Sequence, residues 1–363
     1  MKRFHVVLAI ALVAAAGLGA SSAYSCSEVF LESGGRVKVS ARNFDFGDGT
    51  GFVRYNPSGA RRSAGYAPAG TTPLSWRSRY ASLTFDKVLD AKSAGDDLVS
   101  AGVDGINEAG LKIGTYFLTA SELPTTGART VVDVALLMQY LLDGFASVGD
   151  AVADLEAGRY RVVPTPFLSG GQNAEVLLHF FLHDAAGDSA IVEFLAQKVV
   201  VTRKKDIPHP VLANHTYAES LDFLSQHEGY GGSRIIPGGW DFRPDTGQMV
   251  PERFVRGVYY LERLPSLSNS ARAVDYGFAT IQITSMAPFP TGPNSQQSTH
   301  WTIVTDIDNA EVHFRTLRNP TIATIDLRKL FFSRAARAGQ LDLTRTDLAG
   351  DVTCRFYRRH CEE

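Results

Sequence analysis

The segment around Cys26 constrains this chain more than any other. Two basic residues precede an apolar run over residues 6–20, and the small residues Ala23 and Ser25 stand shortly before Cys26. A basic start, an apolar run and small residues at the cleavage site are typical of the signal peptide of an exported protein. We therefore expect residues 1–25 to be removed, so that Cys26 becomes the first residue of the mature chain.

A cysteine at the start of a chain has unusual chemistry. An α-amine ordinarily titrates near ~8 and a thiol near ~8.5, so this one residue supplies a nucleophile and a candidate general base. Alternatively, the segment could be a membrane anchor, Cys26 could carry a lipid, or Cys26 could be a structural cysteine. The apolar run has about 15 residues, fewer than the roughly 20 that span a bilayer. Tyr24 and Ala23 are unusual residues for a lipid-attachment signal.

Composition limits the class of protein. The 363 residues contain 44% hydrophobic and 20% charged residues, which is typical of a globular chain with a sizeable core. Without the two basic residues of the signal peptide, 34 basic and 38 acidic residues remain, so the formal charge is −4. This balance gives no reason to expect a nucleic-acid partner. We expect an exported protein, periplasmic or secreted, with no stable membrane anchor.

The chain has three cysteines, and an odd number in an exported protein indicates a possible reactive thiol. Cys354 and Cys361 are close in sequence, so we expect them to form a disulfide in an oxidising compartment and to leave Cys26 free. The nine histidines are scattered, without CxxC, HExxH or HxH spacing. We therefore expect no metal site, and we expect no cofactor.

The apolar pattern predicts blocks of strands and helices. A Gly-Gly turn between residues 27–30 and 36–41 predicts a hairpin, and we expect Asp45 at the exit of its second strand. Further strands are expected over residues 83–85, 104–107, 112–118, 159–163, 176–183, 189–195, 198–202, 300–306, 311–317 and 321–326, and helices over 130–145, 147–157, 217–225, 251–264 and 270–286. Loops are expected over 228–248 and 288–298. Hairpin-linked strands interleaved with helices predict an α+β fold with antiparallel sheets in layers.

Six segments, in this order, resemble the choloylglycine hydrolase family, which contains penicillin V acylases and bile salt hydrolases. They are CSEVF, ARNFDF, DGINEAGL, VLAN, ERFVR and HWTIVTD, and they extend from Cys26 to about Asp326. Members of this family are N-terminal nucleophile hydrolases. The resemblance implies an αββα sandwich of two antiparallel sheets between helical layers, a single domain over residues 26–363 and a homotetramer.

The resemblance also assigns roles to residues by position. It implies that Cys26 is the nucleophile, that Arg42 lies beside its thiol and that Asp45 holds the terminal amine. Asn214 corresponds to a side-chain donor to the oxyanion, and Arg253 to an arginine that completes the polar network. A tetrahedral intermediate needs such donors aimed at its developing negative charge. Without the resemblance, an ordinary ion pair would be the simpler interpretation of Arg42 with Asp45.

A second oxyanion donor is implied at the backbone N–H of Phe117, or of Tyr116 if the alignment shifts by one residue. We expect Phe46, Tyr116 and Phe117 to contribute to an apolar, aromatic substrate pocket. Gram-negative members tend to have tryptophan at the positions of Phe46 and Phe117, and the loop over residues 240–250 looks longer than usual. These departures concern the substrate and leave the chemistry intact.

The leading hypothesis is an amidase that cleaves a linear C–N amide bond of a small N-acyl substrate through a Cys26 thioester. Penicillin V and N-acyl homoserine lactones rank above conjugated bile salts as substrates. A catalytically silent envelope protein with the same fold is the main alternative. A papain-like peptidase is a third possibility, which would require one of His183, His215 and His300 to act with an internal cysteine.

Overall fold

The structure is a computed structural model of the chain. It describes residues 26–89, 99–169, 172–234, 236, 249–267, 269–292, 295–332 and 337–357. Within these ranges, no helix is both long and apolar enough to cross a membrane. The predicted signal peptide, most of the loop expected around residues 240–250 and Cys361 lie outside the described residues.

The first large sheet is built around the N-terminal hairpin, and its strands pair antiparallel except at the β21–β23 edge. In spatial order its strands are β17 (Val211–Leu212), β1 (Ser27–Ser33), β2 (Val37–Phe46), β19 (Ser295–Asp306), β20 (Glu311–Thr316), β21 (Ala323–Asp326) and β23 (Gly350–Asp351), with β18 (Phe289–Gly292) beside β19. Segments from both ends of the chain therefore meet in one sheet.

The second large sheet is antiparallel throughout. Its strands are, in spatial order, β16 (Lys198–Arg203), β15 (Ser189–Leu195), β14 (Leu178–His183), β9 (Lys112–Phe117), β8 (Val99–Asn107), β7 (Ser82–Leu89), β3 (Gly51–Asn56) and β22 (Gly339–Asp342). Smaller sheets contain β4 (Arg61–Ser63), β5 (Thr72–Pro73), β6 (Ser75–Arg77), β10 (Thr130–Asp133), β11 (Arg161–Val163), β12 (Thr165–Ser169) and β13 (Gln172–Val176).

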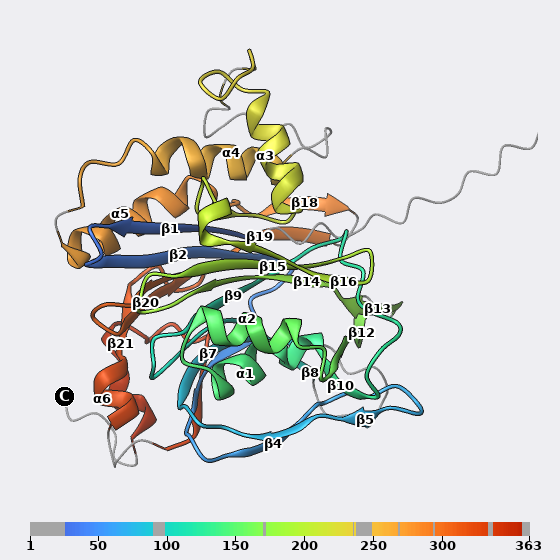
Figure 1. The fold of residues 1–363 in the computed structure, drawn as a ribbon. Helices are drawn as coiled ribbons and strands as arrows, with labels where there is room; N and C mark the ends of the chain where they lie inside the picture. Colours follow the sequence, from blue (N-terminus) through green and yellow to red (C-terminus); the bar gives the residue numbers. More distant parts are fainter. Residues whose placement is uncertain are drawn as a thin grey trace, which may run out of the picture.

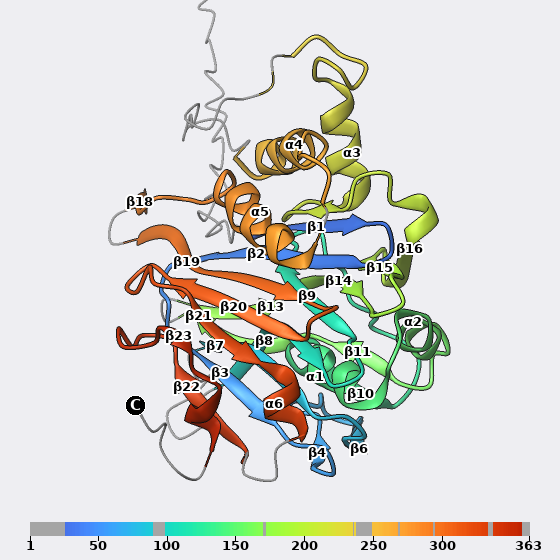
Figure 2. The ribbon, with the colours of Figure 1, turned by 90° about the vertical axis from the view of Figure 1, so that its left-hand side faces the viewer.

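Helices cover the outer faces of the two stacked sheets (Figures 1 and 2). On the first sheet, α4 (Met249–Leu261) packs on β1 and β17, and α5 (Ser270–Gln282) packs on β2 and β19. On the second sheet, α1 (Val134–Gly144) packs on β8 and β9, and α2 (Val148–Glu156) packs on β15 and β16. Helix α3 (Tyr217–Ser225) lies against α4, and α6 (Leu327–Phe332) against β20 and β21. This arrangement confirms the predicted αββα sandwich.

The predicted N-terminal hairpin is confirmed. Strands β1 and β2 pair antiparallel from Ser27↔Asn43 to Ser33↔Val37. Their turn places Gly34 and Gly35 at φ values of 56° and 68°, where a side chain would strain the backbone. The register puts Glu28 opposite Arg42.

Asp45 lies at the exit of β2, as expected, but it is still within the strand, which ends at Phe46. Side chains of a strand alternate between its two faces, so Arg42 and Asp45 point in opposite directions. Arg42 reaches the second sheet, where it donates to the carbonyl of Val103. Asp45 instead faces helix α4, where it meets Arg253.

Several element boundaries also differ from expectation. The helix expected from Thr130 begins at Val134, because residues 130–133 form a strand that pairs with β5 and β11. The loop expected over 288–298 contains β18 and the start of β19. By contrast, α3 begins at Tyr217 as predicted, where Thr216 and its capping box satisfy backbone groups of the first turn.

Candidate active site

Cys26 immediately precedes β1 and is a free, buried cysteine. Its Sγ atom lies 4.0 Å from the main-chain oxygen of Asp45. Burial raises the pKa of the thiol, and the positive charge of Arg42 is the strongest opposing influence. The Asp45 carboxylate raises this pKa further, whereas Arg253 lowers it. The apolar surroundings of the thiol thus favour its neutral form, whereas the two arginines favour the thiolate.

The backbone nitrogen of Cys26 belongs to a hydrogen-bonded group that we call the outer cluster: the buried residues Cys26, Asp45, Asn214 and Arg253, and the partly buried Thr299. The Cys26 nitrogen donates to Oδ1 of Asn214, and Nη2 of Arg253 donates to the same oxygen at 3.3 Å. Nη1 of Arg253 lies 2.8 Å from Oδ2 of Asp45, and the Thr299 hydroxyl donates to Oδ1 of Asp45. Four of the five residues that the resemblance singles out thus meet on the α4 side of the first sheet.

The contacts of the Cys26 nitrogen differ from the sequence-based expectation. Asp45 was expected to hold the nitrogen of Cys26, but the hydrogen bond from that nitrogen goes to Asn214, while the Asp45 carboxylate binds Arg253 and Thr299. Burial raises the pKa of Asp45 to about 6, although Arg253 and Thr299 oppose this rise. The amide of Asn214 also donates from Nδ2 to the carbonyl of Phe117, at 2.7 Å.

Thr299 is a site residue that the sequence analysis missed. It pairs with Asp45 across the β2–β19 ladder, beside a register shift between Thr299 and Trp301. Such a bulge re-aims the side chains next to it. The sequence has no signal for this register shift, because residues around it were expected to form a loop and the start of a strand.

On the opposite face of β2, between the sheets, lies a second buried group, which we call the inner cluster: Glu28, Arg42, Asp104, Lys112 and Tyr116. All five side chains are almost completely inaccessible to solvent. Lys112 Nζ lies 2.7 Å from Glu28 and 3.1 Å from Asp104, and Arg42 Nη1 lies 3.8 Å from Asp104. Apart from Arg42, this group was not anticipated as a polar cluster.

An apolar cavity of about 60 Å³ opens at Cys26. Its other lining residues are Phe44, Phe46, Lys87, Leu89, Ala101, Gly102, Val103, Thr115, Phe117, Phe167, Val176 and Leu178. Phe46 and Phe117, both expected in the pocket, line this cavity. Tyr116 does not: neighbouring residues of a strand face opposite sides, so its ring lies under Arg42 and its hydroxyl donates to Glu28.

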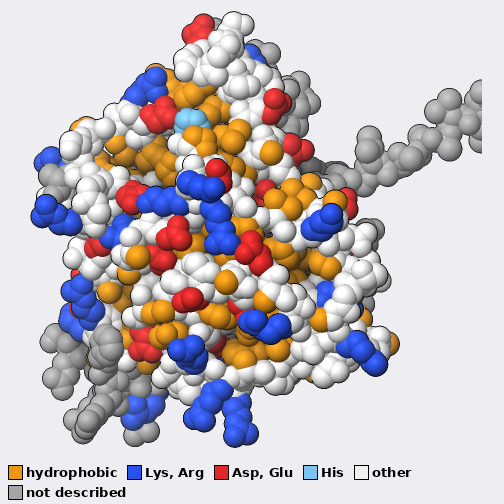
Figure 3. Space-filling view, in the orientation of Figure 1, with side chains coloured by type: hydrophobic (Ala, Val, Ile, Leu, Met, Phe, Trp, Pro, Cys, Tyr) orange, Lys and Arg blue, Asp and Glu red, His pale blue; other side chains and the backbone are white. Residues whose placement is uncertain are grey.

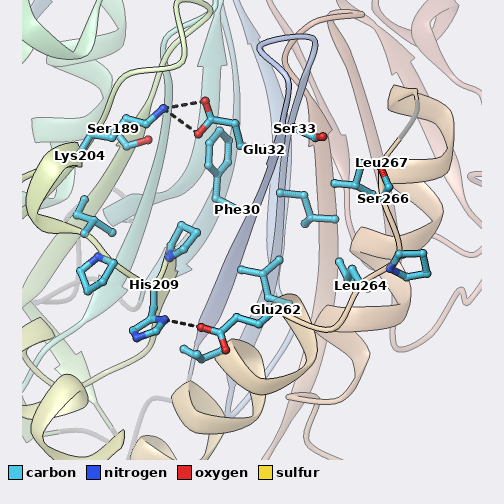
Figure 4. A pocket seen from close by; sticks show the side chains of 17 residues that line it. Phe30, Glu32, Ser33, Ser189, Lys204, His209, Glu262, Leu264, Ser266 and Leu267 are labelled. Carbon is cyan, nitrogen blue, oxygen red and sulfur yellow. Dashed lines mark hydrogen bonds and ion pairs between the residues drawn. The ribbon is translucent and has the colours of Figure 1, made fainter. Parts of the chain in front are cut away.

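A larger groove of about 450 Å³ lies on the open side of β1 and does not include Cys26. Figure 4 shows Phe30 on its floor, with Lys204 bridging to Glu32 at one end and His209 to Glu262 at the other. Hydrophobic side chains gather on this face around α4, above a row of charged ones (Figure 3). The groove holds none of the predicted site residues.

Of the three histidines considered in the sequence analysis, His183 and His300 have other partners, whereas the buried Nδ1 atom of His215 has no hydrogen-bond partner among the described residues. His183 is buried and contacts Glu28 and Ser189, and His300 contacts the carbonyl of Phe46. The charged groups that act on the Cys26 thiol are two arginines and Asp45. Among the described residues, no three His, Cys, Asp or Glu side chains are arranged to hold a metal ion.

Cys354, in a short 3₁₀ helix (Thr353–Phe356), is disulfide-bonded. Its predicted partner, Cys361, lies outside the described residues. The predicted pairing places this disulfide in the C-terminal tail, far along the chain from the Cys26 thiol.

Comparisons with a family model and with a characterised relative indicate the same protein family. Residues 94–338 match the family described as linear amide C–N hydrolases, choloylglycine hydrolase family. The chain is 29% identical to a penicillin V acylase from Pectobacterium atrosepticum, over 93% of this chain and 90% of the relative.

Solved structures with a similar fold include members of the same family. A penicillin V acylase from Agrobacterium tumefaciens has a TM-score of 0.71 and 26% identity, covering 93% of this chain and 98% of that one. A mutant of conjugated bile acid hydrolase from Clostridium perfringens has a TM-score of 0.68 at 17% identity, covering 90% of this chain and 98% of that one, and supports the fold alone. The family match over residues 94–338 and the site geometry lead to one conclusion: the chain belongs to the choloylglycine hydrolase family and is a hydrolase acting on linear amides.

Proposed function

We propose that this protein is an exported acylase in which Cys26, freed by removal of residues 1–25, attacks the carbonyl carbon of an N-acyl amide. The α-amine of Cys26 takes the thiol proton, and the thiolate forms a tetrahedral intermediate. Collapse of this intermediate expels the amine product, which takes up a proton, and leaves an acyl thioester on Cys26. Water then hydrolyses the thioester and regenerates the thiol.

The observation that carries this proposal is the position of Cys26 between two different environments. Its thiol lines the apolar cavity, while its nitrogen is bound by Asn214 in the outer cluster. An acyl chain placed in the cavity would bring its carbonyl to the thiol, and the nitrogen would be held where it can accept the thiol proton. Positioning a nucleophile and a base together is the basis of covalent catalysis.

Asn214 is the proposed side-chain donor to the oxyanion. An amide nitrogen carries two hydrogens, and one of them is directed to the carbonyl of Phe117. The other would serve the substrate oxygen, with the backbone N–H of Phe117 as the second donor. Removing one such donor typically lowers kcat about 10²- to 10³-fold.

The cavity supports an apolar acyl group as the recognised part of the substrate. Its walls are aromatic and aliphatic side chains apart from Lys87 and Thr115, and Lys87 binds Asp48 at 2.8 Å. Phe44, Phe46 and Phe117 give this lining an aromatic character that suits an aromatic ring or an alkyl chain. We therefore propose phenoxyacetyl and fatty acyl amides, such as penicillin V and N-acyl homoserine lactones, ahead of conjugated bile salts.

Amine release from these three substrate classes tests the proposal. The mature protein should release amine from penicillin V or an N-acyl homoserine lactone faster than from glycine or taurine conjugates of bile acids. Cys26→Ser should abolish release while the protein remains folded, because a hydroxyl is a poorer nucleophile when its base is an amine. Cleavage of bile acid conjugates alone would reverse the substrate order, and no cleavage of any amide would favour a silent envelope protein.

We also propose export to the periplasm or medium and assembly as a homotetramer, on the basis of the leader and the family resemblance. Mass spectrometry of the exported protein should find Cys26 at its N-terminus with a free amine. Light scattering should give a mass four times that of the mature chain. A lipid on Cys26 or a retained leader would contradict the export proposal, and a monomeric mass would contradict the assembly.

A further inference from the structure

Glu28 is a carboxylate that is completely buried between the two large sheets. It lies on β1 two residues after Cys26 and directly opposite Arg42 on β2. Because side chains alternate along a strand and opposite residues share a face, Glu28 and Arg42 both point between the sheets. A carboxylate in that apolar space is costly unless other groups compensate for its charge.

Four side chains supply that compensation. Oε1 of Glu28 accepts hydrogen bonds from Ser40, at 2.7 Å, and contacts Nε2 of His183 at 2.9 Å. Oε2 accepts from Lys112 at 2.7 Å and from the hydroxyl of Tyr116. Burial acts to raise the pKa of Glu28, but Lys112 and His183 outweigh it and hold the pKa well below the usual range of a glutamate.

Two routes connect this carboxylate to Arg42. The first route runs through ion pairs: the Lys112 ammonium that binds Glu28 also lies 3.1 Å from Asp104, and Asp104 lies 3.8 Å from the Arg42 guanidinium. Through Tyr116, the ring fixed by Glu28 lies 4.7 Å below the Arg42 guanidinium, a favourable cation–π distance. Both routes therefore connect Glu28 to the Arg42 guanidinium.

The guanidinium of Arg42 is also fixed by backbone carbonyls. Its Nη1 donates to Val103 and, at 3.2 Å, to Thr115. Both of those residues line the cavity at Cys26. Nε and Nη2 of Arg42 are buried and have no hydrogen-bond partner within the described part of the chain. A buried arginine of this kind exerts its charge on the nearby thiol without being neutralised by a single carboxylate.

We propose that Glu28, Lys112 and Asp104 are positioning residues that hold Arg42 beside Cys26 and, through their balanced charges, set the pH range in which the nucleophile works. The inference rests on the proposed role of Cys26 as nucleophile. The inner cluster contains two acidic side chains, Glu28 and Asp104, and two basic ones, Lys112 and Arg42, in mutual contact. Removing one charge therefore changes the potential at the thiol with a sign that can be stated in advance.

Other charged and titratable groups face the same space. The charges of Asp45 on β2 and Arg253 on α4 also act on the Cys26 thiol, and Lys87 on β7 lines the same cavity. Around Glu28, His183 lies on β14, where burial lowers its pKa, and Glu32 acts on His183 from β1. His179 on β14 contacts the Tyr116 ring. Because none of these groups is altered in the variants below, their contribution to the thiol is expected to cancel in the comparison.

The rate of alkylation of Cys26 by iodoacetamide, measured against pH, tests the proposal without requiring turnover. Lys112→Met removes a positive charge and draws Arg42 toward the two remaining carboxylates, and both effects disfavour the thiolate. The alkylation midpoint should rise by up to about one pH unit, which corresponds to about 1.4 kcal/mol of lost stabilisation of the thiolate. Glu28→Gln should lower the midpoint by up to about one unit.

The double variant Lys112→Met/Glu28→Gln restores neutrality and should return the midpoint to within about 0.3 units of the wild-type value. Lys38→Met is the matched control. Like Lys112, Lys38 is a buried lysine in contact with a carboxylate, Asp308 at 2.6 Å, but it lies on β2. It lies toward the other end of the strand and should leave the midpoint unchanged, whatever it costs in thermal stability.

Opposite shifts in the two single variants, with recovery in the double variant, would support the proposal. Equal midpoints in all variants, or shifts of the same sign in both single variants, would overturn it. If Lys112→Met does not fold, Glu28→Gln and Asp104→Asn carry the test, and both should lower the midpoint. Alkylation needs only the thiol. If the midpoints shift as expected but the protein cleaves no amide, the result counts against the proposed function and not against this inference.

Discussion

The outer and inner clusters occupy opposite faces of the same hairpin, and they act on Cys26 in different ways. In the outer cluster, Asn214 binds the Cys26 nitrogen directly, and Arg253 connects Asn214 to Asp45. In the inner cluster, no hydrogen bond to Cys26 is present among the described residues, and Arg42 reaches the thiol through its charge. Because side chains alternate along a strand, contacts to the nitrogen and electrostatic effects on the thiol come from opposite faces of the hairpin. Outer substitutions should therefore affect turnover, and inner ones the reactivity of the thiol.

The largest expected difference between the clusters comes from Asn214→Ala. This change removes the acceptor of the Cys26 nitrogen and the proposed oxyanion donor, so kcat should fall about 10²- to 10³-fold. Alkylation of the thiol by iodoacetamide should remain within about threefold of wild type, because Arg42 is untouched. Steady-state kinetics and alkylation rates on the same sample measure both. A parallel loss of alkylation would show that the two clusters are not separable.

Asp45→Asn should have a smaller effect on kcat, about 10- to 10²-fold, because Asn214 still binds the nitrogen. Its clearest signature is in pH dependence. The buried Asp45 has a pKa of about 6, above the usual aspartate value near ~3.9. A raised pKa stabilises the fold at low pH, and this contribution is lost as pH rises through 6.

Urea unfolding of both proteins between pH 4 and 7 measures this contribution. The free energy of unfolding of wild type should fall relative to that of Asp45→Asn by roughly 3 kcal/mol as the pH rises. The pH–rate profile of wild type should also gain activity as Asp45 ionises near pH 6, and the variant should lack this step. A constant stability difference across the pH range would show that Asp45 is ionised throughout.

Thr299→Val should give the smallest effect. The Thr299 hydroxyl bond to Asp45 lowers the pKa of that carboxyl, so its loss should move the acidic limb of the pH–rate profile upward by less than about one unit. The plateau of kcat should change by no more than about threefold. An unchanged acidic limb would mean that Thr299 has no influence on the outer cluster.

The sequence predicted the outer cluster better than the inner one, and the reason lies in the kind of signal. Asn214 and Arg253 stand in segments that resemble the family, so their roles could be assigned by position. Thr299 meets Asp45 only because of a register shift in β19, which is a tertiary feature. The fold followed from the order of strand and helix blocks and from the same resemblance.

Tyr116 shows a signal that was available and not used. Thr115 and Phe117 share one face of β9, so Tyr116 had to face the other way. The same period places Lys112 and Tyr116 on one face, toward Glu28. What the sequence lacks is the pairing of β9 with the far sheet, since Glu28 and Lys112 are 84 positions apart.

The most direct test of the account is a mature protein that keeps Ser25 ahead of Cys26, compared with one that begins at Cys26. With Ser25 retained, the nitrogen of Cys26 is an amide without basicity, while the thiol, Arg42 and the cavity are unchanged. We predict that penicillin V or N-acyl homoserine lactone cleavage is lost and that iodoacetamide still alkylates Cys26 at a rate within about threefold of the mature protein. Full amide cleavage by the protein that retains Ser25 would contradict the role of the terminal amine as base.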